Sequence, residues 1–304
     1  MASRLRLAVL DAPLTLGLRR DDPSVVPGAA RLGATLIDLG LLEQLNADNA
    51  GVLVAPTEYS PQRKLGLSAL NATAVQRYAL ALGERVGRII DAGQCPVVLG
   101  GDCSVLLGAA LALRRRGRAG LLFCDGHTDY WPPAQSRTGG LAGMDLWFVT
   151  RGGLPLLDAQ IPAPLVAAAD AVVFVARDGE ARRNARLPDP EADGVRLLDL
   201  QAVRQRGAAV AAREAVAHFH ERGLERVWVH VDADVLHASL MPAVDSPQPD
   251  GLWTHEAIAV LRTAMRSGMV AGLSVTVYDP DRDPDGEAAR HLLEVLVSGC
   301  PLNF

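Results

Sequence analysis

Short apolar runs alternate along the chain with longer segments in which apolar residues recur every three or four positions. The longer segments have the amphipathic period of a helix, and two of them end at a glycine, Gly93 and Gly223. They predict helices at residues 28–37, 73–92, 104–114, 208–222, 255–266 and 287–297. The short runs predict strands at residues 5–10, 51–55, 96–99, 120–124, 171–176, 195–198, 226–231 and 270–278.

The alternation of strands with helices predicts an α/β fold in three layers, in which a mostly parallel sheet is covered by helices on both faces. No internal repeat and no low-complexity linker divides the chain, so we expect residues 1–304 to form a single domain. Two Pro- and Gly-rich segments, 131–141 and 237–253, read as long loops. Loops of that length in a compact domain are usually functional.

Three of the predicted strands end in clusters of side chains that can bind metal ions. The clusters are Gly-Gly-Asp-Cys-Ser at 100–104, Asp-Gly-His-Thr-Asp at 125–129 and Asp-Ala-Asp at 232–234. In an open parallel sheet, ligands bind outside the carboxyl ends of the strands. We therefore expect the three clusters to converge in space.

The spacing within these clusters favours metal binding over simple capping. Asp125, His127 and Asp129 alternate with other residues and project to one side of an extended segment, as do Asp232 and Asp234. Buried together, these carboxylates would repel one another unless cations were present. Two divalent ions about 3.5 Å apart could share a carboxylate and bridge a water whose pKa falls toward neutrality, giving a hydroxide able to attack an sp² carbon.

The competing interpretation is that the aspartates cap helices and turns. Asp102, directly before a predicted helix, fits that role. Capping does not explain five acceptors gathered at strand ends.

Composition excludes several other classes of function. The 304 residues carry a formal net charge of −5 and no long basic run, which argues against a nucleic-acid partner. No apolar run is long enough to span a bilayer, and the apolar start of the chain is too short for a signal peptide. The four cysteines lack C-x-x-C spacing and are too few for a disulfide scaffold. These features favour a cytoplasmic protein with no membrane partner.

The order G-G-D-x-S, D-x-H-x-D, D-x-D resembles the ureohydrolase family of arginases, agmatinases and formimidoylglutamases. Further segments resemble that family along most of the chain: Pro27-Gly28, the loop 138–144, Arg-Asp-Gly-Glu at 177–180 and Val-Tyr-Asp-Pro at 277–280. The resemblance implies an arginase-like fold and two divalent ions, usually Mn²⁺, with Zn²⁺, Fe²⁺ or Ni²⁺ as alternatives. It also implies a small guanidino or amidine substrate and a homo-oligomer, a trimer or hexamer.

The resemblance further implies a role for each ligand position. One metal would take Cys103, Asp125, Asp129 and Asp232, and the other Asp125, His127, Asp232 and Asp234. Asp125 and Asp232 would bridge the two ions, and Asp129 would orient the bridging hydroxide. The family reaction is hydrolysis of a C–N bond in a linear amidine.

Cys103 departs from the family, which has a histidine ligand at this position. Three interpretations stay open: a thiolate ligand, a weak or empty first metal site, and a redox-sensitive position. A Cys-bearing subset of the family includes a hydrolase of hydroxylated arginine. Its D-C-S, D-G-H-x-D and H-x-D-x-D-V-L features are similar to 102–104, 125–129 and 230–236 here.

Two further departures bear on catalysis and charge. Ala142 stands where arginases have a proton-shuttling histidine; His237 is a candidate substitute, or simply a loop histidine. Val277 stands where the family has a glutamate that binds the guanidinium group, which argues against ordinary arginine as substrate. Asp245 could supply a substitute charge from its loop.

The remaining candidates concern the far end of a substrate. Trp131 replaces an asparagine that recognises the α-amino acid end in arginases, and it would either line the pocket or anchor its loop. Thr138 and Glu180 are candidate contacts for an amino-acid-like group. His230 receives little weight, since it can point to the opposite face of its strand, and Cys124 should face away from the metals.

Three functions are compatible with these residues. The first is an active amidinohydrolase, supported by the ligand positions that match. The second is a catalytically impaired relative with a binding or assembly role, supported by the changes at Cys103, Ala142 and Val277. The third is another metal-dependent amide hydrolase on the same scaffold, of the deacetylase kind. Metal content separates the first two, and the released product separates the third.

Overall fold

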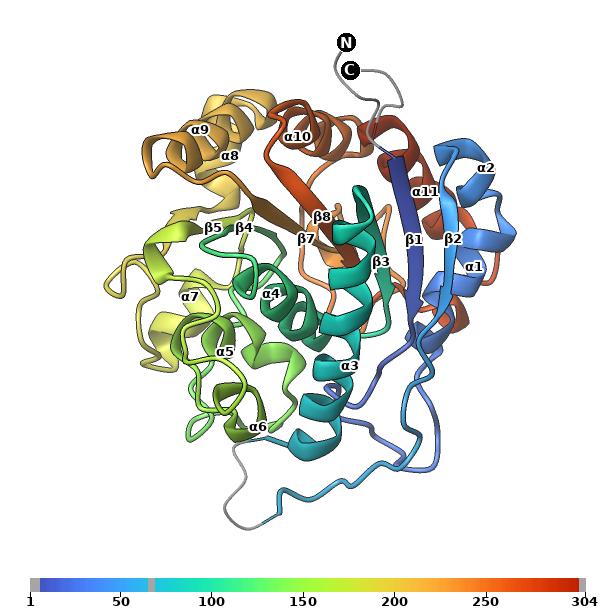
Figure 1. Cartoon of the computed structure of the whole chain (residues 1–304), viewed down its shortest axis with the longest axis vertical. Coiled ribbons are helices and arrows are strands. Elements are labelled where there is room, and N and C mark those ends of the chain that lie inside the picture. The colour runs from blue at the N-terminus through green and yellow to red at the C-terminus, as the bar shows by residue number, and fades with distance from the viewer. Residues whose placement is uncertain (1–5, 65–68, 301–304) are drawn as a thin grey trace.

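The computed structural model describes residues 6–64 and 69–300. Within them one eight-stranded sheet runs through the molecule, with the strand order β2-β1-β3-β8-β7-β4-β5-β6 (Figure 1). Every neighbouring pair of strands is parallel, which confirms the predicted sheet. The strands are β1 (Arg6–Ala12), β2 (Asp48–Val52), β3 (Gln94–Gly100), β4 (Gly120–Cys124), β5 (Ala171–Phe174), β6 (Arg196–Leu198), β7 (Val227–Asp232) and β8 (Val270–Thr276).

Helices cover both faces of this sheet and complete the three layers. They are α1 (Leu32–Asp38), α2 (Leu41–Leu45), α3 (Ala72–Asp91), α4 (Leu106–Arg114), α5 (Asp145–Arg151), α6 (Pro155–Asp158), α7 (Gly179–Asn184), α8 (Leu200–Arg206), α9 (Ala208–Glu221), α10 (Thr254–Arg266) and α11 (Glu287–Gly299). One hydrophobic core joins the sheet to α3, α4, α5 and α6, and a second joins it to α1, α2, α9, α10 and α11. No helix of the described ranges has both the length and the apolar character needed to cross a membrane.

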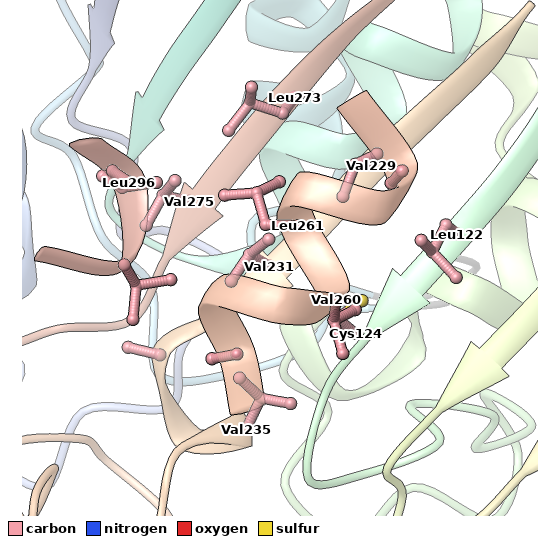
Figure 2. Packing of buried hydrophobic residues seen from close by; sticks show 14 of the residues in the cluster. Leu122, Cys124, Val229, Val231, Val235, Val260, Leu261, Leu273, Val275 and Leu296 are labelled. Carbon is pink, nitrogen blue, oxygen red and sulfur yellow. The ribbon is translucent and has the colours of Figure 1, made fainter. Parts of the chain in front are cut away.

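Successive residues of the central strands enter opposite cores. Figure 2 shows Cys124 and Val231 packed against Val260 of α10, together with other apolar residues on that face of β4, β7 and β8. Phe123 of β4 and Trp228 of β7 belong to the other core. This alternation fixes where the next residues point, because Asp125 follows Cys124 and Asp232 follows Val231. Cys124 therefore faces α10, away from Asp125, as the sequence predicts.

The structure corrects several of the predicted elements. The strand predicted at 51–55 is wrong by three residues: β2 lies at the sheet edge, where exposed polar residues replace the apolar run, and Ala8 pairs with Asp48. The helix predicted at 28–37 divides into a 3₁₀ turn, Gly28–Arg31, and α1. β8 ends at Thr276, because Val277 turns to a positive φ of 72°. Helices α2, α5, α6, α7 and α8 were missed, because none is long enough to display a helical period.

A buried carboxylate joins three elements of the fold. Asp170, just before β5, is fully buried and accepts two 2.7 Å hydrogen bonds from the Arg118 guanidinium before β4 and a further bond from Arg222 after α9. Burial alone raises the pKa of a carboxyl, but here the two guanidinium groups outweigh it and hold the pKa of Asp170 below its ordinary value of 3.8.

We expect Asp170→Asn to lower the free energy of unfolding at pH 7 by about 1–3 kcal/mol, because charge-assisted hydrogen bonds are lost. A carboxyl whose pKa is lower in the folded state stabilises the fold above the unfolded pKa and loses that effect as pH falls through the folded value. The difference between Asp170→Asn and wild type should therefore shrink below about pH 4. Urea unfolding across this pH range measures it, and a difference that grows in acid would contradict the assignment.

Candidate metal centre

The sheet order places the three ligand clusters side by side. β3, β7 and β4 lie near the middle of the sheet, with β8 between β3 and β7. Cys103 opens the 3₁₀ turn after β3, Asp125 follows β4, and Asp232 is the last residue of β7. The convergence predicted from the sequence is therefore present, and it follows from the parallel topology alone.

Asp102 anchors the first cluster through hydrogen bonds to the backbone. Its buried side chain accepts hydrogen bonds from the backbone N–H of Gly17 at 2.7 Å and of Ser104 at 2.9 Å, so it caps the turn as expected. The segment that contains Leu14 packs closely against Gly101, and only glycine fits there, because a Cβ would lie 2.1 Å from the Leu14 carbonyl oxygen. The Gly-Gly-Asp segment thus anchors the strand end and presents Cys103.

One group of potential donors contains Asp125, His127 and Asp234, whose ligand atoms lie within 4.8 Å of one another. His127 Nδ1 is 2.8 Å from Asp234 Oδ2 and 3.7 Å from Asp125 Oδ1. The other oxygen of Asp234 accepts a 2.7 Å hydrogen bond from the Gly126 N–H. Although burial opposes the imidazolium, the two carboxylates raise the pKa of His127, and His127 in turn holds the pKa of Asp234 low against its burial.

A second group contains Cys103, Asp125 and His230, again with ligand atoms within 4.8 Å of one another. Cys103 Sγ also donates a 2.9 Å hydrogen bond to Asp232 Oδ2 and lies 3.2 Å from Thr276 Oγ1. Asp125 belongs to both groups. Its position between two donor sets is what a carboxylate shared by two metal ions requires.

The electrostatics of these residues fit a pair of cations. Asp125 is fully buried, and Asp232 is 5% exposed. Burial, followed by the charge of Asp234, raises the pKa of Asp125 to about 7. Burial and the charges of Asp234 and Asp125 likewise raise the pKa of Asp232. Asp125 Oδ2 has no hydrogen-bond partner among the described residues. Divalent ions would satisfy this oxygen and stabilise the ionised carboxylates, so the residues present fit two metals.

Two of the six predicted ligands, Asp129 and Asp232, lie outside both groups. Asp232 is joined to the second group by its hydrogen bond from Cys103. Asp129 is linked to the groups by charge. Its backbone has a positive φ of 42°. Burial and the charges of Asp125 and Asp145 raise the pKa of its carboxyl, which places it within electrostatic reach of the centre. A positive φ in a residue other than glycine marks a locally strained backbone, of the kind found at functional sites.

Asp145 is an acidic residue that the sequence analysis missed. It opens α5, is fully buried, and its Oδ2 has no partner in the part of the chain that the structure describes. Burial, then the charge of Asp125, raises its pKa. An aspartate in the first turn of a helix ordinarily stabilises the helix dipole, so nothing in the sequence distinguished it from a routine helix start.

The predicted proton donor, His237, has its described side-chain contacts within its own loop. Its ring stacks on Trp253, with centroids 4.3 Å apart, and its Nδ1 lies 2.8 Å from Ser239 Oγ. Its Nε2 is 4.0 Å from Asp250 Oδ1. These partners all lie between positions 237 and 253, and the catalytic role of His237 stays a prediction.

The four residues predicted to contact a substrate differ in solvent exposure. Trp131 is partly buried and packs on the core that contains α3 and α4, and its contact with a substrate stays a prediction. Thr138 is exposed, and its Oγ1 accepts a 3.2 Å hydrogen bond from Gly140 N–H. Glu180, also exposed, lines a cavity of about 620 Å³. Asp245 lies in the long loop after β7, and burial of its carboxyl and the charge of Asp234 raise its pKa.

The cavity lies beside the candidate metal centre. Its lining includes Thr128, Arg177 and Asp178 besides Glu180. Thr128 Oγ1 donates a 2.9 Å hydrogen bond to Asp178 Oδ2, and Arg177 Nη2 donates a 2.7 Å bond to the Asp234 carbonyl. The wall of the cavity is therefore tied directly to the two segments that carry His127 and Asp234.

Gln248 is another residue that the sequence did not reveal. It lies in the long loop after β7, and its side-chain Nε2 is 3.0 Å from His127 Nε2. His127 turns its other nitrogen, Nδ1, toward Asp125 and Asp234. A partner on the outer nitrogen of a metal-binding histidine fixes its ring orientation, and rotation of the amide lets Gln248 either donate or accept.

We expect Gln248→Ala to weaken metal binding at the His127 site by about 10-fold, the effect typical of losing such a partner. Competition titration with a metal chelator measures this change. Gln135→Ala is the matched control, because Gln135 is an exposed loop residue. Equal affinities in Gln248→Ala and Gln135→Ala would show that Gln248 does not support His127.

A parallel α/β sheet whose central strand ends carry two buried donor groups, joined by one aspartate, defines a candidate binuclear metal centre. Comparison with known proteins identifies the family of the chain. The Arginase family model matches residues 22–300. Human Arginase-1 is 24% identical over 305 aligned residues, covering 96% of this chain and 90% of that protein. The chain belongs to the arginase family.

Solved structures share the fold over nearly the whole chain. Arginase from Bacillus caldovelox superposes with a TM-score of 0.83 at 21% identity, covering 97% of each chain. Proclavaminate amidino hydrolase from Streptomyces clavuligerus superposes with a TM-score of 0.68 at 20% identity, covering 98% of this chain and 92% of the other. The predicted arginase-like, three-layer fold and the predicted family are thereby confirmed.

Proposed function

We propose that this protein is a metal-dependent hydrolase of a linear guanidine, hydroxyguanidine or amidine compound. The observation that carries the proposal is Asp125, a fully buried carboxylate that belongs to two donor groups at once. Arginase and proclavaminate amidino hydrolase, by their names, act on compounds of this class. A pair of divalent ions bound here would supply a water of lowered pKa and stabilise developing negative charge.

The candidate residues would have two roles, binding the ions and orienting the attacking water. Cys103, Asp125, His127, Asp232 and Asp234 would hold the ions. Asp129, next to them but in neither group, would accept a hydrogen bond from the attacking water and orient it. Burial of these carboxylates keeps bulk water away, which strengthens each electrostatic interaction with a substrate.

Two apolar residues define the substrate more narrowly. Val277 is 3% exposed and Ala142 is 7% exposed. By resemblance to the family, Val277 stands at the position of the guanidinium-binding glutamate and Ala142 at that of the proton-shuttling histidine. Without that glutamate a strongly cationic guanidinium lacks its partner. Without that histidine a leaving group of lower pKa is favoured. A hydroxyguanidine or a less basic amidine meets the first condition better than arginine does, because it is less often cationic.

The experiment is a product assay with metal analysis. Protein purified without added metal, and again after Mn²⁺ loading, is incubated with arginine, hydroxyarginine, agmatine and an N-acetylated amine. Urea, hydroxyurea and ammonia are measured against acetate. We expect about two ions per loaded chain, as a binuclear centre requires, and release of a urea-type product. Acetate as the released product would instead identify a deacetylase-like enzyme.

A second candidate function, binding or assembly without catalysis, is favoured by the changes at Cys103, Ala142 and Val277. It predicts one ion or none per chain and no product from any substrate. Metal content below two with no turnover would therefore replace the hydrolase proposal with this one.

A further inference from the structure

His230 lies on the metal-facing side of β7, two residues before Asp232. It is fully buried, and its ring stacks on Phe123, with centroids 4.9 Å apart and an interplanar angle of 16°. Its Nδ1 is 2.8 Å from Ser274 Oγ on β8, and Trp228 Nε1 donates a 3.0 Å bond to the same oxygen. The ring is therefore held in one orientation by packing and by one of its two nitrogens.

The other nitrogen of His230 is Nε2. Nε2 is buried and has no hydrogen-bond partner within the described ranges. A buried polar atom without a hydrogen-bond partner destabilises a fold, so its presence in a fixed ring calls for a ligand. A ring nitrogen of His230 lies within 4.8 Å of the Cys103 sulfur and of an Asp125 carboxylate oxygen. Since Nδ1 is occupied by Ser274, Nε2 is the nitrogen available for coordination.

We propose that His230 is a ligand of the first metal ion, in a donor set with Cys103 and Asp125 and with Asp232 beside them. The inference rests on the proposed function only in requiring that the centre binds metal. The family's imidazole at position 103 is replaced by a thiol, and in this chain β7 supplies an imidazole to the same site from a different direction. The first site thus keeps one nitrogen ligand and gains a sulfur ligand.

The spacing of the three donors suits a small divalent ion. Ligands bound at about 2.0–2.3 Å to a tetrahedral ion lie roughly 3.3–3.8 Å from one another. The donors of Cys103, Asp125 and His230 are at most 4.8 Å apart, so modest side-chain rotation closes the site around an ion. A sulfur–imidazole–carboxylate set favours Zn²⁺, Co²⁺ or Fe²⁺ relative to Mn²⁺.

The competing role for His230 is that its Nε2–H donates to the Cys103 sulfur and binds no metal. X-ray absorption of the Zn²⁺-loaded protein separates the two roles, because each coordinated imidazole contributes its own scattering. Two imidazoles per pair of ions, from His127 and His230, are expected in the wild type. In His230→Ala one imidazole should remain, and first-site affinity should fall by about 10- to 100-fold.

The matched control is His220→Ala, which removes an exposed histidine from α9. It should leave the imidazole count and both affinities unchanged. If His230→Ala does not fold, the wild-type spectrum still decides, since the hydrogen-bond role predicts a single imidazole for two ions. Two bound ions with one imidazole would overturn the role of His230 and leave the proposed function standing. Failure to bind any ion would overturn both.

Discussion

Replacing Asp125 by asparagine is expected to empty both metal sites and to lower kcat/KM for any substrate of this protein by at least about 1,000-fold. The loss exceeds the 10- to 100-fold typical of a residue that only supports a ligand. Asp125 contributes a donor to each group, so one substitution weakens both. An asparagine oxygen is neutral and cannot neutralise two ions in a buried site.

The same substitution should not destabilise the fold of the metal-free protein. Burial and the charge of Asp234 raise the pKa of Asp125 to about 7. A carboxyl whose pKa is raised in the folded state destabilises the fold as pH rises through that value, because the buried group must then ionise. Asp125→Asn removes this effect, so metal-free Asp125→Asn should be at least as stable as wild type at pH 8.

Metal analysis, isothermal titration and chemical unfolding at pH 8 measure these outcomes together. Asp38→Asn is the control, because Asp38 is an exposed residue at the end of α1. Two tightly bound ions in Asp125→Asn would contradict the shared carboxylate. Loss of metal accompanied by lower metal-free stability would instead indicate that Asp125 acts mainly in folding.

The predictable part of this centre follows from strand periodicity. Asp125 and Asp232 lie at the ends of buried strands, and their direction is fixed by the residues before them, Cys124 and Val231, which enter the opposite core. Two-residue alternation in an extended chain is enough to establish this. The same rule places the side chain of His230 on the same side of β7 as Asp232. The sequence interpretation gave His230 little weight because the side of the strand to which it points was left open.

The parts that could not be predicted depend on contacts between distant segments. Gln248 reaches His127 across 121 positions of sequence, from a loop without regular structure. Asp145 opens a seven-residue helix whose approach to the centre depends on tertiary packing. The bounds of β2 were displaced by three residues, because an edge strand exposed to solvent needs no apolar run. In each case the local sequence is ordinary, and only the three-dimensional arrangement gives the residue its role.

The structure also narrows the interpretations of Cys103. The side chain is 2% exposed, and burial together with the charges of Asp232 and Asp125 raises its pKa well above the ordinary value. A buried, protonated thiol is a poor target for oxidants, which react with exposed thiolates. A bound cation would reverse this state, since metal coordination deprotonates a thiol. The geometry therefore favours a metal ligand over a redox-sensitive position.

Cys103→His and Cys103→Ser should consequently have large and different effects. We expect Cys103→Ser to weaken Zn²⁺ or Co²⁺ binding at the first site by about 1,000-fold, because a neutral hydroxyl is a far poorer ligand for these ions than a thiolate. Cys103→His restores the residue type of the family at this position. It should raise the affinity of the site for Mn²⁺ relative to Zn²⁺ by about 100-fold, because imidazole is a harder ligand than thiolate.

Titrations of the three proteins with Mn²⁺, Zn²⁺ and Co²⁺ measure these preferences. Co²⁺ adds a direct signature, because a thiolate ligand produces an intense ultraviolet charge-transfer band that both variants must lose. Cys95→Ser is the control, since Cys95 is a buried thiol in the core on the α1 side of the sheet. A wild-type protein that binds Co²⁺ without this band, or a Cys103→Ser variant that retains the first ion, would mean that Cys103 lies beside the metal without binding it. The first site would then depend on the carboxylates and His230 alone.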